Sequence, residues 1–236
     1  QSKNAGKSFD AKLMIQQENL GNQTLAEYVI SQYTGTQGEN SIYYHNSTLA
    51  NGAGDNSYSY AGANPNNYVC FGSDTTTCSE DNLYRIIGVF DNQVKLIKAT
   101  IAKSNLLGTD GAYNSDTSYQ WSSLTSCPSS TAYNSNNGIY QLANKNTIAA
   151  ADFAGCNEWH YSDLNKTNLN TNFVNNIGSI WADKIATTTW KVGGGSVSNI
   201  AKSVPKTAYQ YEVGSSASST TYEAKIGLMY VSDYYY

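Results

Sequence analysis

Hydrophobic residues recur with helical spacing in the segment TLAEYVISQY, residues 24–33. Thr24 and Glu27 have the T-x-x-E spacing of a capping box, which provides acceptors for free backbone N–H groups at the start of a helix. Gly35 interrupts the pattern soon afterwards. We therefore expect a helix that begins after Thr24. One face of this helix would carry a continuous stripe of side chains from Leu25, Tyr28, Val29 and Gln32.

A second helical pattern covers residues 168–186, where an apolar residue recurs at every fourth position. Asn168 is the expected N-cap, because an asparagine side chain can accept a free N–H group of the first helical turn. Gly178 lies inside the pattern and weakens the helix by roughly 1 kcal/mol relative to alanine. The expected buried stripe contains Leu169, Phe173, Ile177, Trp181 and Ile185, with Ile180 beside it.

Alternating and β-branched residues predict strands in the rest of the chain. The clearest signal is a hairpin over residues 84–100, YRIIGVFDNQVKLIKAT, in which the dipeptide Asp-Asn tolerates the positive φ angles of a two-residue turn. Shorter strands are expected at residues 67–71 and 187–191. The last segment, AKIGLMYVSDYYY (residues 224–236), is expected to end the chain as a strand.

Long turn-rich segments separate these elements. Residues 35–67 are dense in turn formers, and residues 101–160 are irregular and rich in Tyr, Ser and Asn. Residues 1–23 are predicted to form a polar N-terminal arm, and no repeat or linker divides residues 24–236. The expected fold class is therefore α+β, a single domain with an antiparallel sheet, two flanking helices and long loops on one side.

The composition indicates what kind of surface the fold presents. Charged residues are 14% of the chain, and 20 tyrosines supply much of the 40% that is hydrophobic. Tyr combines a large contact area with few rotatable bonds, while Ser, Gly and Asn make adaptable hydrogen bonds. This mixture suits recognition by exposed loops, and it is equally typical of secreted β-rich proteins in general.

The charge pattern argues against two classes of partner. The net charge is −4, and Arg85 is the single arginine among 14 basic residues. Nucleic-acid binding requires clustered Lys and Arg to neutralise phosphates, so we expect no nucleic-acid partner. No apolar run reaches the roughly 18–20 residues of a membrane-spanning helix, so we expect no membrane span in the chain.

The four cysteines, Cys70, Cys78, Cys127 and Cys156, carry the strongest signal about location. Their spacing fits neither the close pairs of a zinc site nor the C-x-x-C of a redox motif. Three disulfide connectivities are possible, and four free buried cysteines are the alternative. The simplest pairing, Cys70 with Cys78 and Cys127 with Cys156, staples two loops and implies an oxidising location, extracellular or at the cell surface.

Signals for catalysis and metal binding are weak. His160 lies near Cys156, Glu158 and Asp163, but His45 is the one further histidine, and this set does not make a metal site. No nucleophile motif frames a Ser/His/Asp combination. We therefore expect no catalytic residues, no metal and no cofactor.

Aromatic residues in the region around Cys127 and Cys156 are the candidate binding residues. Trp181 and Trp190 are expected in the core, because one lies in a helical stripe and the other in a strand. Aromatic rings in the intervening loops are available as stacking platforms for a ligand. The predicted binding residues are Trp121, Tyr133, Tyr140 and Trp159.

Four stretches resemble a large family of uncharacterised bacterial surface proteins: YAGANPNNYVCFGSD, CSEDNLYRIIGVFDNQVKLIKA, NLNTNFVNNIGSIWADKIATTTWKVGG and YEAKIGLMYVSDY. The resemblance extends from about Thr24 to the C-terminus. It implies an exported protein with a variant of the fold shared by C-type lectins and formylglycine-generating enzymes. Some members of this family are tethered to the envelope or built into pilin-like chains, and the resemblance carries over no catalytic residues.

The C-terminus departs from the pattern of that family. Family sequences continue with further strands, and Tyr234 stands where Gly is usual. We therefore expect a domain truncated at its C-terminus, or one completed by another chain. In the second case residues 1–23 would donate a strand to the open sheet edge of a neighbouring subunit.

These features together favour a non-catalytic extracellular protein for adhesion or recognition, which binds a glycan or protein ligand through loops in residues 101–160. One alternative is a structural, pilin-like subunit that self-associates into an extracellular filament. The other is an enzyme of the formylglycine-generating type, which needs reactive cysteines or metal-bound thiolates.

Peptide mapping without reducing agent is expected to recover Cys70 joined to Cys78 and Cys127 joined to Cys156. On the chain-entropy model, closing loops of about 8 to 30 residues stabilises the folded state by roughly 2–4 kcal/mol each. A bridge between Cys78 and Cys127, or four free thiols, contradicts this pairing.

Overall fold

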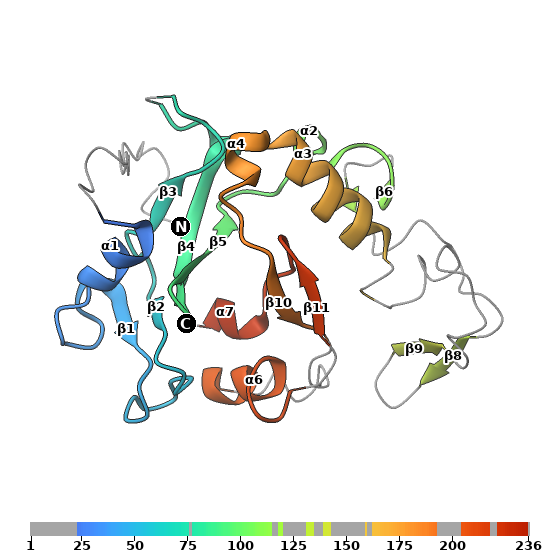
Figure 1. The fold of residues 1–236 in the computed structure, drawn as a ribbon. Helices are drawn as coiled ribbons and strands as arrows, with labels where there is room; N and C mark the ends of the chain where they lie inside the picture. Colours follow the sequence, from blue (N-terminus) through green and yellow to red (C-terminus); the bar gives the residue numbers. More distant parts are fainter. Residues whose placement is uncertain are drawn as a thin grey trace, which may run out of the picture.

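The structure is a computed structural model of the chain. It describes residues 23–75, 77–114, 118–119, 131–134, 139–142, 159, 162–192, 204–217 and 221–235. These residues form a mixed α+β fold in which short helices lie around an antiparallel sheet (Figure 1). Within the described ranges, no helix is long and apolar enough to cross a membrane.

The predicted central hairpin is confirmed. β4 (Leu83–Phe90) and β5 (Gln93–Lys98) pair antiparallel through a turn at Asp91 and Asn92, whose φ angles are 47° and 61°. Asn and Asp tolerate this left-handed backbone better than other residues with a side chain, because their short polar groups can hydrogen-bond locally. The turn chemistry visible in the sequence therefore sets the register of the hairpin.

β4 is the centre of the main sheet because it is paired along both edges. One edge carries β5, and the other carries two short strands, β3 (Tyr68–Cys70) beside the start of β4 and β2 (Tyr58–Tyr60) beside its end. β1 (Ile42–Tyr44) pairs with β2. The strand expected at residues 67–71 is confirmed as β3, and the turn-rich segment 35–67 contains the short strands β1 and β2.

Gly88 allows β2 to approach β4. A β-bulge lies between Ile86 and Gly88, and a Cβ atom at position 88 would lie 2.2 Å from the carbonyl oxygen of Tyr58. No side chain fits this space without moving β2, so the pairing of β2 with β4 depends on glycine.

α1 (Leu25–Ser31) has the predicted capping box. The Thr24 hydroxyl accepts the Glu27 N–H at 3.2 Å, and the Glu27 carboxylate accepts the Thr24 N–H at 2.7 Å. Ala26 and Val29 on this helix are buried in the main hydrophobic core. The helix therefore covers one face of the β4–β5 hairpin, as the sequence predicts.

The second predicted helix is present but is not continuous. It begins before Asn168 as the π-helix η6 (Leu164–Phe173), continues as α3 (Val174–Asn176) and resumes as α4 (Ser179–Ala182). Gly178 separates the last two pieces with a φ of +88°, which an α-helix cannot contain. The glycine that was expected only to weaken one helix instead divides it.

The apolar stripe of that segment points into the core as predicted. Phe173 and Ile177 are buried, and Ile180 is 65% exposed. Leu169, Trp181 and Ile185 are partly buried against the core.

Asn168 is not an N-cap, and this prediction was wrong. Its side chain is fully buried inside η6, where the amide accepts the Ala112 N–H at 2.9 Å. The same amide donates to the carbonyl oxygens of Leu107 at 2.7 Å and Asp110 at 3.0 Å. The backbone groups that need partners here belong to a loop far away in the sequence, not to the first turn of the helix.

Asn172 and Asn176 extend this contact along the same helical segment. Each donates a side-chain hydrogen bond at 3.0 Å, to the carbonyl oxygens of Leu107 and Leu106 respectively. These bonds hold α2 (Ser104–Leu107) against η6 and α3. A row of asparagine amides therefore replaces apolar packing on this side of the helix.

The C-terminal part of the chain forms a second, two-stranded sheet. The strand predicted at residues 187–191 is confirmed as β10 (Thr188–Lys191), which pairs antiparallel with β11 (Thr221–Ala224). α6 (Pro205–Glu212) lies between these strands in the sequence. Figure 1 shows α6 and α7 next to each other beside this small sheet.

The strand expected over residues 224–236 is wrong beyond Ala224, because α7 (Val231–Tyr235) is a helix. Its first turn is capped by carboxylates. Asp233 accepts the Tyr230 N–H, and Glu212 accepts the N–H groups of both residues that follow Tyr230. The unpaired terminal strand that suggested strand donation is therefore not present in residues 221–235.

Shorter elements complete the described ranges. They are the 3₁₀ turns η2 (Glu39–Ser41) and η3 (Glu80–Asn82), and the two small hairpins β6 (Tyr113–Asn114) with β7 (Ser118–Tyr119), and β8 (Thr131–Asn134) with β9 (Ile139–Leu142).

Replacing Asn168 with alanine is expected to lower the free energy of unfolding by about 2–4 kcal/mol, because it removes the side-chain partner of the buried Ala112 N–H and of the Asp110 carbonyl, and one of two amide donors to the Leu107 carbonyl. Asn175→Ala is the matched control, since Asn175 is exposed on the neighbouring α3 and should change stability by less than about 0.5 kcal/mol. Urea unfolding of the three proteins measures the difference. Equal stabilities of the two variants would contradict the assigned role of Asn168.

Candidate functional site

A cleft of about 1100 Å³ lies along β5, lined by side chains from both faces of this strand and by residues of the C-terminal elements. Among the described strands, β5 pairs with β4 alone, so its other edge borders this space. α1 and β3 contribute residues to one wall, and α4, β10 and α7 contribute to the other. We call this space the central cleft. Its volume is similar to that of pockets that hold small ligands in proteins.

The walls of the central cleft combine aromatic and aliphatic side chains with hydroxyl groups. Charged side chains line the cleft as well, among them Asp74, Lys95, Lys184, Lys225 and Asp233. The apolar part is formed by Val69, Phe71, Tyr84, Val94, Leu96, Phe173, Trp181, Ile185 and Ile226, and the hydroxyl groups come from Ser73, Thr75, Thr188 and Thr189.

A lysine surrounded by aromatic rings forms the most organised part of the central cleft. The Lys95 ammonium lies 4.4 Å from the centroid of the Tyr230 ring, 5.5 Å from Trp190 and 5.6 Å from Phe90. It also pairs with the Asp233 carboxylate at 2.6 Å. We call these five residues the Lys95 cluster. Cation–π contact and ion pairing both stabilise the ammonium in this position.

The strand geometry explains why Lys95 points away from the core. Side chains alternate between the two faces of a strand, and Val94 and Leu96 on β5 pack with the main core. Lys95 therefore lies on the opposite face, together with Phe90 at the end of β4. The side chain of Lys95 is 21% exposed, so most of its length is covered.

Trp190 and Tyr230 are held in place by their own polar groups. The Trp190 indole N–H donates to the carbonyl oxygen of Ala224 at 3.0 Å, and Gly227 lies so close that a Cβ atom there would be 2.5 Å from the indole ring. The Tyr230 hydroxyl donates to the carbonyl oxygen of Lys191 at 3.0 Å and accepts its N–H at 2.9 Å. Both rings are therefore oriented before any ligand binds.

The Asp233 side chain is 7% exposed, against 21% for its partner Lys95. Besides Lys95 it accepts the backbone N–H of Tyr230 at 3.0 Å. Glu212, which is also buried, accepts the N–H groups of Val231 and Ser232 at 2.8 Å each. Two carboxylates thus fix the start of α7 and, with it, the position of Asp233.

Burial changes the ionisation of the tyrosine in this cluster. It raises the pKa of Tyr230 to about 12, while the hydrogen bond with the Lys191 backbone acts in the opposite direction. Tyr230 is therefore a neutral phenol at physiological pH. Its role here is as a ring face and a backbone anchor, not as a proton donor.

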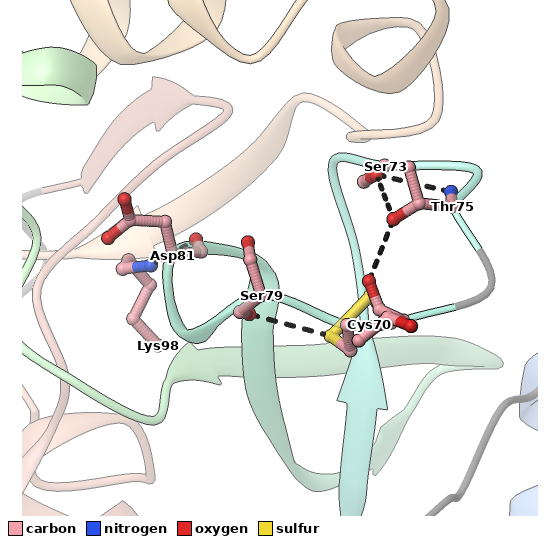
Figure 2. Close-up of a disulfide and its surroundings, with 8 residues drawn as sticks. Cys70, Ser73, Thr75, Ser79, Asp81 and Lys98 are labelled. Carbon is pink, nitrogen blue, oxygen red and sulfur yellow. Dashed lines mark hydrogen bonds between the residues drawn. A yellow bond between two sulfur atoms is a disulfide. The ribbon is translucent and has the colours of Figure 1, made fainter.

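The disulfide loop forms part of the lining of the central cleft, to which Cys70, Ser73 and Thr75 contribute. Cys70 and Cys78 are joined (Figure 2), which confirms this half of the predicted pairing. Inside the loop the hydroxyls of Ser73 and Thr75 lie 2.9 Å apart, and the Thr75 hydroxyl donates to the carbonyl oxygen of Thr77 at 2.8 Å. The crosslink and these bonds hold the loop against the start of β4.

Lys98 anchors the other side of the disulfide loop to the hairpin. Its ammonium donates to the carbonyl oxygen of Asp81 at 2.5 Å (Figure 2). It also lies 5.0 Å from the centroid of the Tyr84 ring. Burial lowers the pKa of Lys98, and the Asp81 carboxylate opposes this effect. The loop is therefore tied to β5 as well as to β3.

His45 borders the central cleft from the β1–β2 side and is 1% exposed. Its Nδ1 atom accepts the Ala53 N–H at 3.0 Å, so the ring contributes an acceptor to the loop between β1 and β2. Burial lowers the pKa of His45, and the Asp55 carboxylate partly opposes this. The neutral imidazole is the form that suits this position.

Of the predicted binding residues, the structure brings two together and buries a third. Tyr133 and Tyr140 are direct register partners in the β8–β9 hairpin. Trp159 is 7% exposed, so the expectation that it lies on the surface is wrong. Trp121, and the predicted pair Cys127 and Cys156, lie outside the described residues.

A metal centre is not found among the described residues, where no group of three or more His, Cys, Asp and Glu side chains could hold an ion. The same part of the chain includes His45, the disulfide and the Lys95 cluster.

The sequence did not point to the Lys95 cluster. The alternation in the hairpin placed Lys95 on the face opposite Leu96, and this was the one available signal. Asp233 and Tyr230 were expected in a strand, so their approach to Lys95 could not be anticipated. Trp190 was expected in the core and is instead half-buried in the cleft wall.

The neutral state of His45 predicts a pH dependence of stability. An unfolded histidine protonates near pH 6.5, whereas the folded pKa of His45 is lower, so the unfolded state binds more protons below that pH. The stability that the folded protein gains from keeping His45 neutral is fully present above about pH 6.5. This stability is lost as the pH falls from there towards the folded pKa of His45. The free energy of unfolding should therefore decrease over this window.

Urea unfolding between about pH 7.5 and 5 is the measurement, with His45→Gln as the comparison. The difference in stability between wild type and His45→Gln should shrink as the pH falls. A difference that is constant across this range would show that His45 is not held neutral.

Comparisons of this chain with protein-family models, with curated proteins and with solved structures find no match. The functional conclusions that follow therefore rest on the residues of the chain and on their geometry.

Proposed function

We propose that this chain is a non-catalytic recognition domain of an exported bacterial surface protein, which binds an uncharged polar ligand, a glycan or a glycan-like surface group, in the central cleft. The observation that carries the proposal is the cleft itself. It is a space of about 1100 Å³ whose walls pair aromatic rings with hydroxyl groups. Sugars present apolar C–H faces and many hydroxyls, and these wall groups complement both.

The rim of the cleft supports the same proposal. Trp181 and Phe71 have ring centroids 5.0 Å apart in an edge-on arrangement, and Lys184 extends over the Trp181 ring at 5.9 Å. Ser73 and Thr75 of the disulfide loop place hydroxyl groups nearby along the lining. Gly72 packs this loop against the helical segment, since a Cβ atom there would lie 3.2 Å from Ile177.

An extracellular location belongs to the proposal and is supported by the Cys70–Cys78 disulfide, because such crosslinks persist in oxidising environments. The family resemblance of the sequence supports an exported protein with a lectin-like variant of the α+β fold. In this proposal the β8–β9 hairpin, which contains Tyr133 and Tyr140, makes a second contact with the surface that carries the ligand. Trp121, which precedes the hairpin in the sequence, contributes to the same contact.

Binding to a glycan array and to whole cells tests the site. Lys184→Ala and Thr75→Ala are expected to weaken binding by roughly tenfold, the effect of about 1.4 kcal/mol of lost contact energy. Ile180→Ala is the matched control, because Ile180 is exposed on α4 but does not line the cleft. Unchanged binding by both cleft variants would overturn the cleft assignment.

A separate set of substitutions tests the proposed contact through the β8–β9 hairpin. Tyr133→Ala and Tyr140→Ala, with Trp121→Ala, should weaken attachment to cells, whereas Tyr211→Ala on α6, which is 39% exposed, should not. Trp159→Ala is expected to act through stability, because that side chain is buried. Loss of binding in the hairpin variants alone would move the recognition surface from the cleft to the loops.

A further inference from the structure

We propose that the Lys95 amine and the Asp233 carboxyl group join in an intramolecular amide bond, which makes the Lys95 cluster a self-modification site that crosslinks β5 to α7. This inference does not depend on the ligand or on the proposed recognition function. It rests on the contact between the two reacting groups, on what covers them and on the donor that is directed at the carboxylate.

The reacting groups are already in contact. The Lys95 nitrogen lies 2.6 Å from an Asp233 carboxylate oxygen, although the two residues are 138 positions apart in the sequence. The fold therefore holds a nucleophilic amine beside a carboxyl carbon in one geometry. Holding two reactants in this way can raise their effective concentration to roughly 10⁵–10⁸ M, which favours condensation that is unfavourable between free molecules in water.

The surroundings hold the two groups together and shield them from most of the solvent. The Asp233 side chain is 7% exposed and that of Lys95 is 21% exposed, and three aromatic rings surround the amine. The ring faces favour the charged amine, and poor hydration disfavours both charges. Transfer of a proton within the pair removes both charges at once, so no isolated charge is left buried.

The bond can form without any reagent outside the pair. A proton moves from the Lys95 ammonium to the Asp233 carboxylate, and the neutral amine then attacks the carboxyl carbon, forming the C–N bond. One C–O bond of the carboxyl group breaks, and the hydroxyl leaves with a second proton from the nitrogen. The products are one amide and one water molecule, so atoms and charge balance and nothing is oxidised or reduced.

A backbone donor fixes the orientation of the Asp233 carboxyl group for this step. The Tyr230 N–H donates at 3.0 Å to the same Asp233 oxygen that contacts Lys95. A carboxyl group held in one orientation beside the amine loses less entropy when the two groups react. Because Tyr230 is fixed through its hydroxyl to the Lys191 backbone, this donor does not need to be reoriented.

The second described ion pair provides an internal comparison. Lys103 and Asp81 are 3.4 Å apart, and their side chains are 58% and 37% exposed. No aromatic ring is recorded over the Lys103 amine in the described part of the chain. We expect this pair to remain unlinked, because water hydrates both charges and the groups are not held together.

The consequence of the bond is a covalent connection between the central hairpin and the C-terminal helix. It would close a loop of 138 residues, far larger than the loop of the Cys70–Cys78 disulfide, and it would survive reducing conditions. A surface protein crosslinked in this way keeps its C-terminal elements attached to the main sheet when the chain is pulled or locally unfolded.

The test is the intact mass of the full chain after denaturation and reduction. The wild-type protein is expected to be lighter than its sequence by one water molecule, and trypsin should yield a branched peptide that joins residues 86–98 to the segment after Lys225. Lys95→Arg keeps the cation beside the rings but cannot form this amide, so it should have the full mass. Asp233→Asn should lose one ammonia instead and give the same branched peptide.

Full mass for the folded wild-type protein would overturn the proposal. So would loss of water that persists in Lys95→Arg, or a branched peptide that contains Lys103 instead of Lys95. Circular dichroism shows whether Lys95→Arg is folded. If that variant does not fold, Asp233→Asn still decides the question. It forms the same amide as the wild-type protein and differs only in releasing ammonia instead of water.

Discussion

Backbone N–H and C=O groups that leave water on folding must find new hydrogen-bond partners, and the described part of this protein depends on asparagine side chains to meet that requirement. Asn168, Asn172 and Asn176 satisfy carbonyl and N–H groups of the segment around α2. Asn170 does the same for Ile226, accepting its N–H and donating to its carbonyl oxygen at 3.0 Å each. One helical segment thereby connects the middle of the chain with its C-terminal part.

This reliance on amides gives the uncharged composition a structural meaning. An amide can donate and accept at once, so it can bond to both groups of an irregular backbone segment without burying a charge. Asn67 shows the same use in the main sheet, where it donates to the carbonyl oxygen of Ile86 at 2.7 Å and accepts from Arg85 at 3.0 Å. The abundance of Asn therefore reflects long loops that need partners as well as any role in recognition.

The central cleft follows from the same architecture. The asparagine-rich segment and α4 stand beside the central hairpin, and the small β10–β11 sheet with α7 closes the far side (Figure 1). In the Lys95 cluster, which lines this cleft, ion pairing and ring contacts join the hairpin to α7.

Features that depend on neighbouring residues were determined by the sequence alone. The Thr24–Glu27 capping box, the Asp91–Asn92 turn and the Cys70–Cys78 crosslink each join groups a few positions apart, so their chemistry is visible in a short stretch of letters. The α+β class followed from these elements and from the apolar periodicity between them.

Features that depend on distant partners were decided by the tertiary structure. Asn168 looked like a helix cap because its true partners lie 56 or more positions away, and the C-terminal segment looked like a strand because the carboxylate of Glu212 that caps α7 belongs to another helix. Lys95 and Asp233 meet across 138 positions. Such contacts leave no local pattern, because either residue alone is compatible with solvent exposure, and the fold alone brings them together.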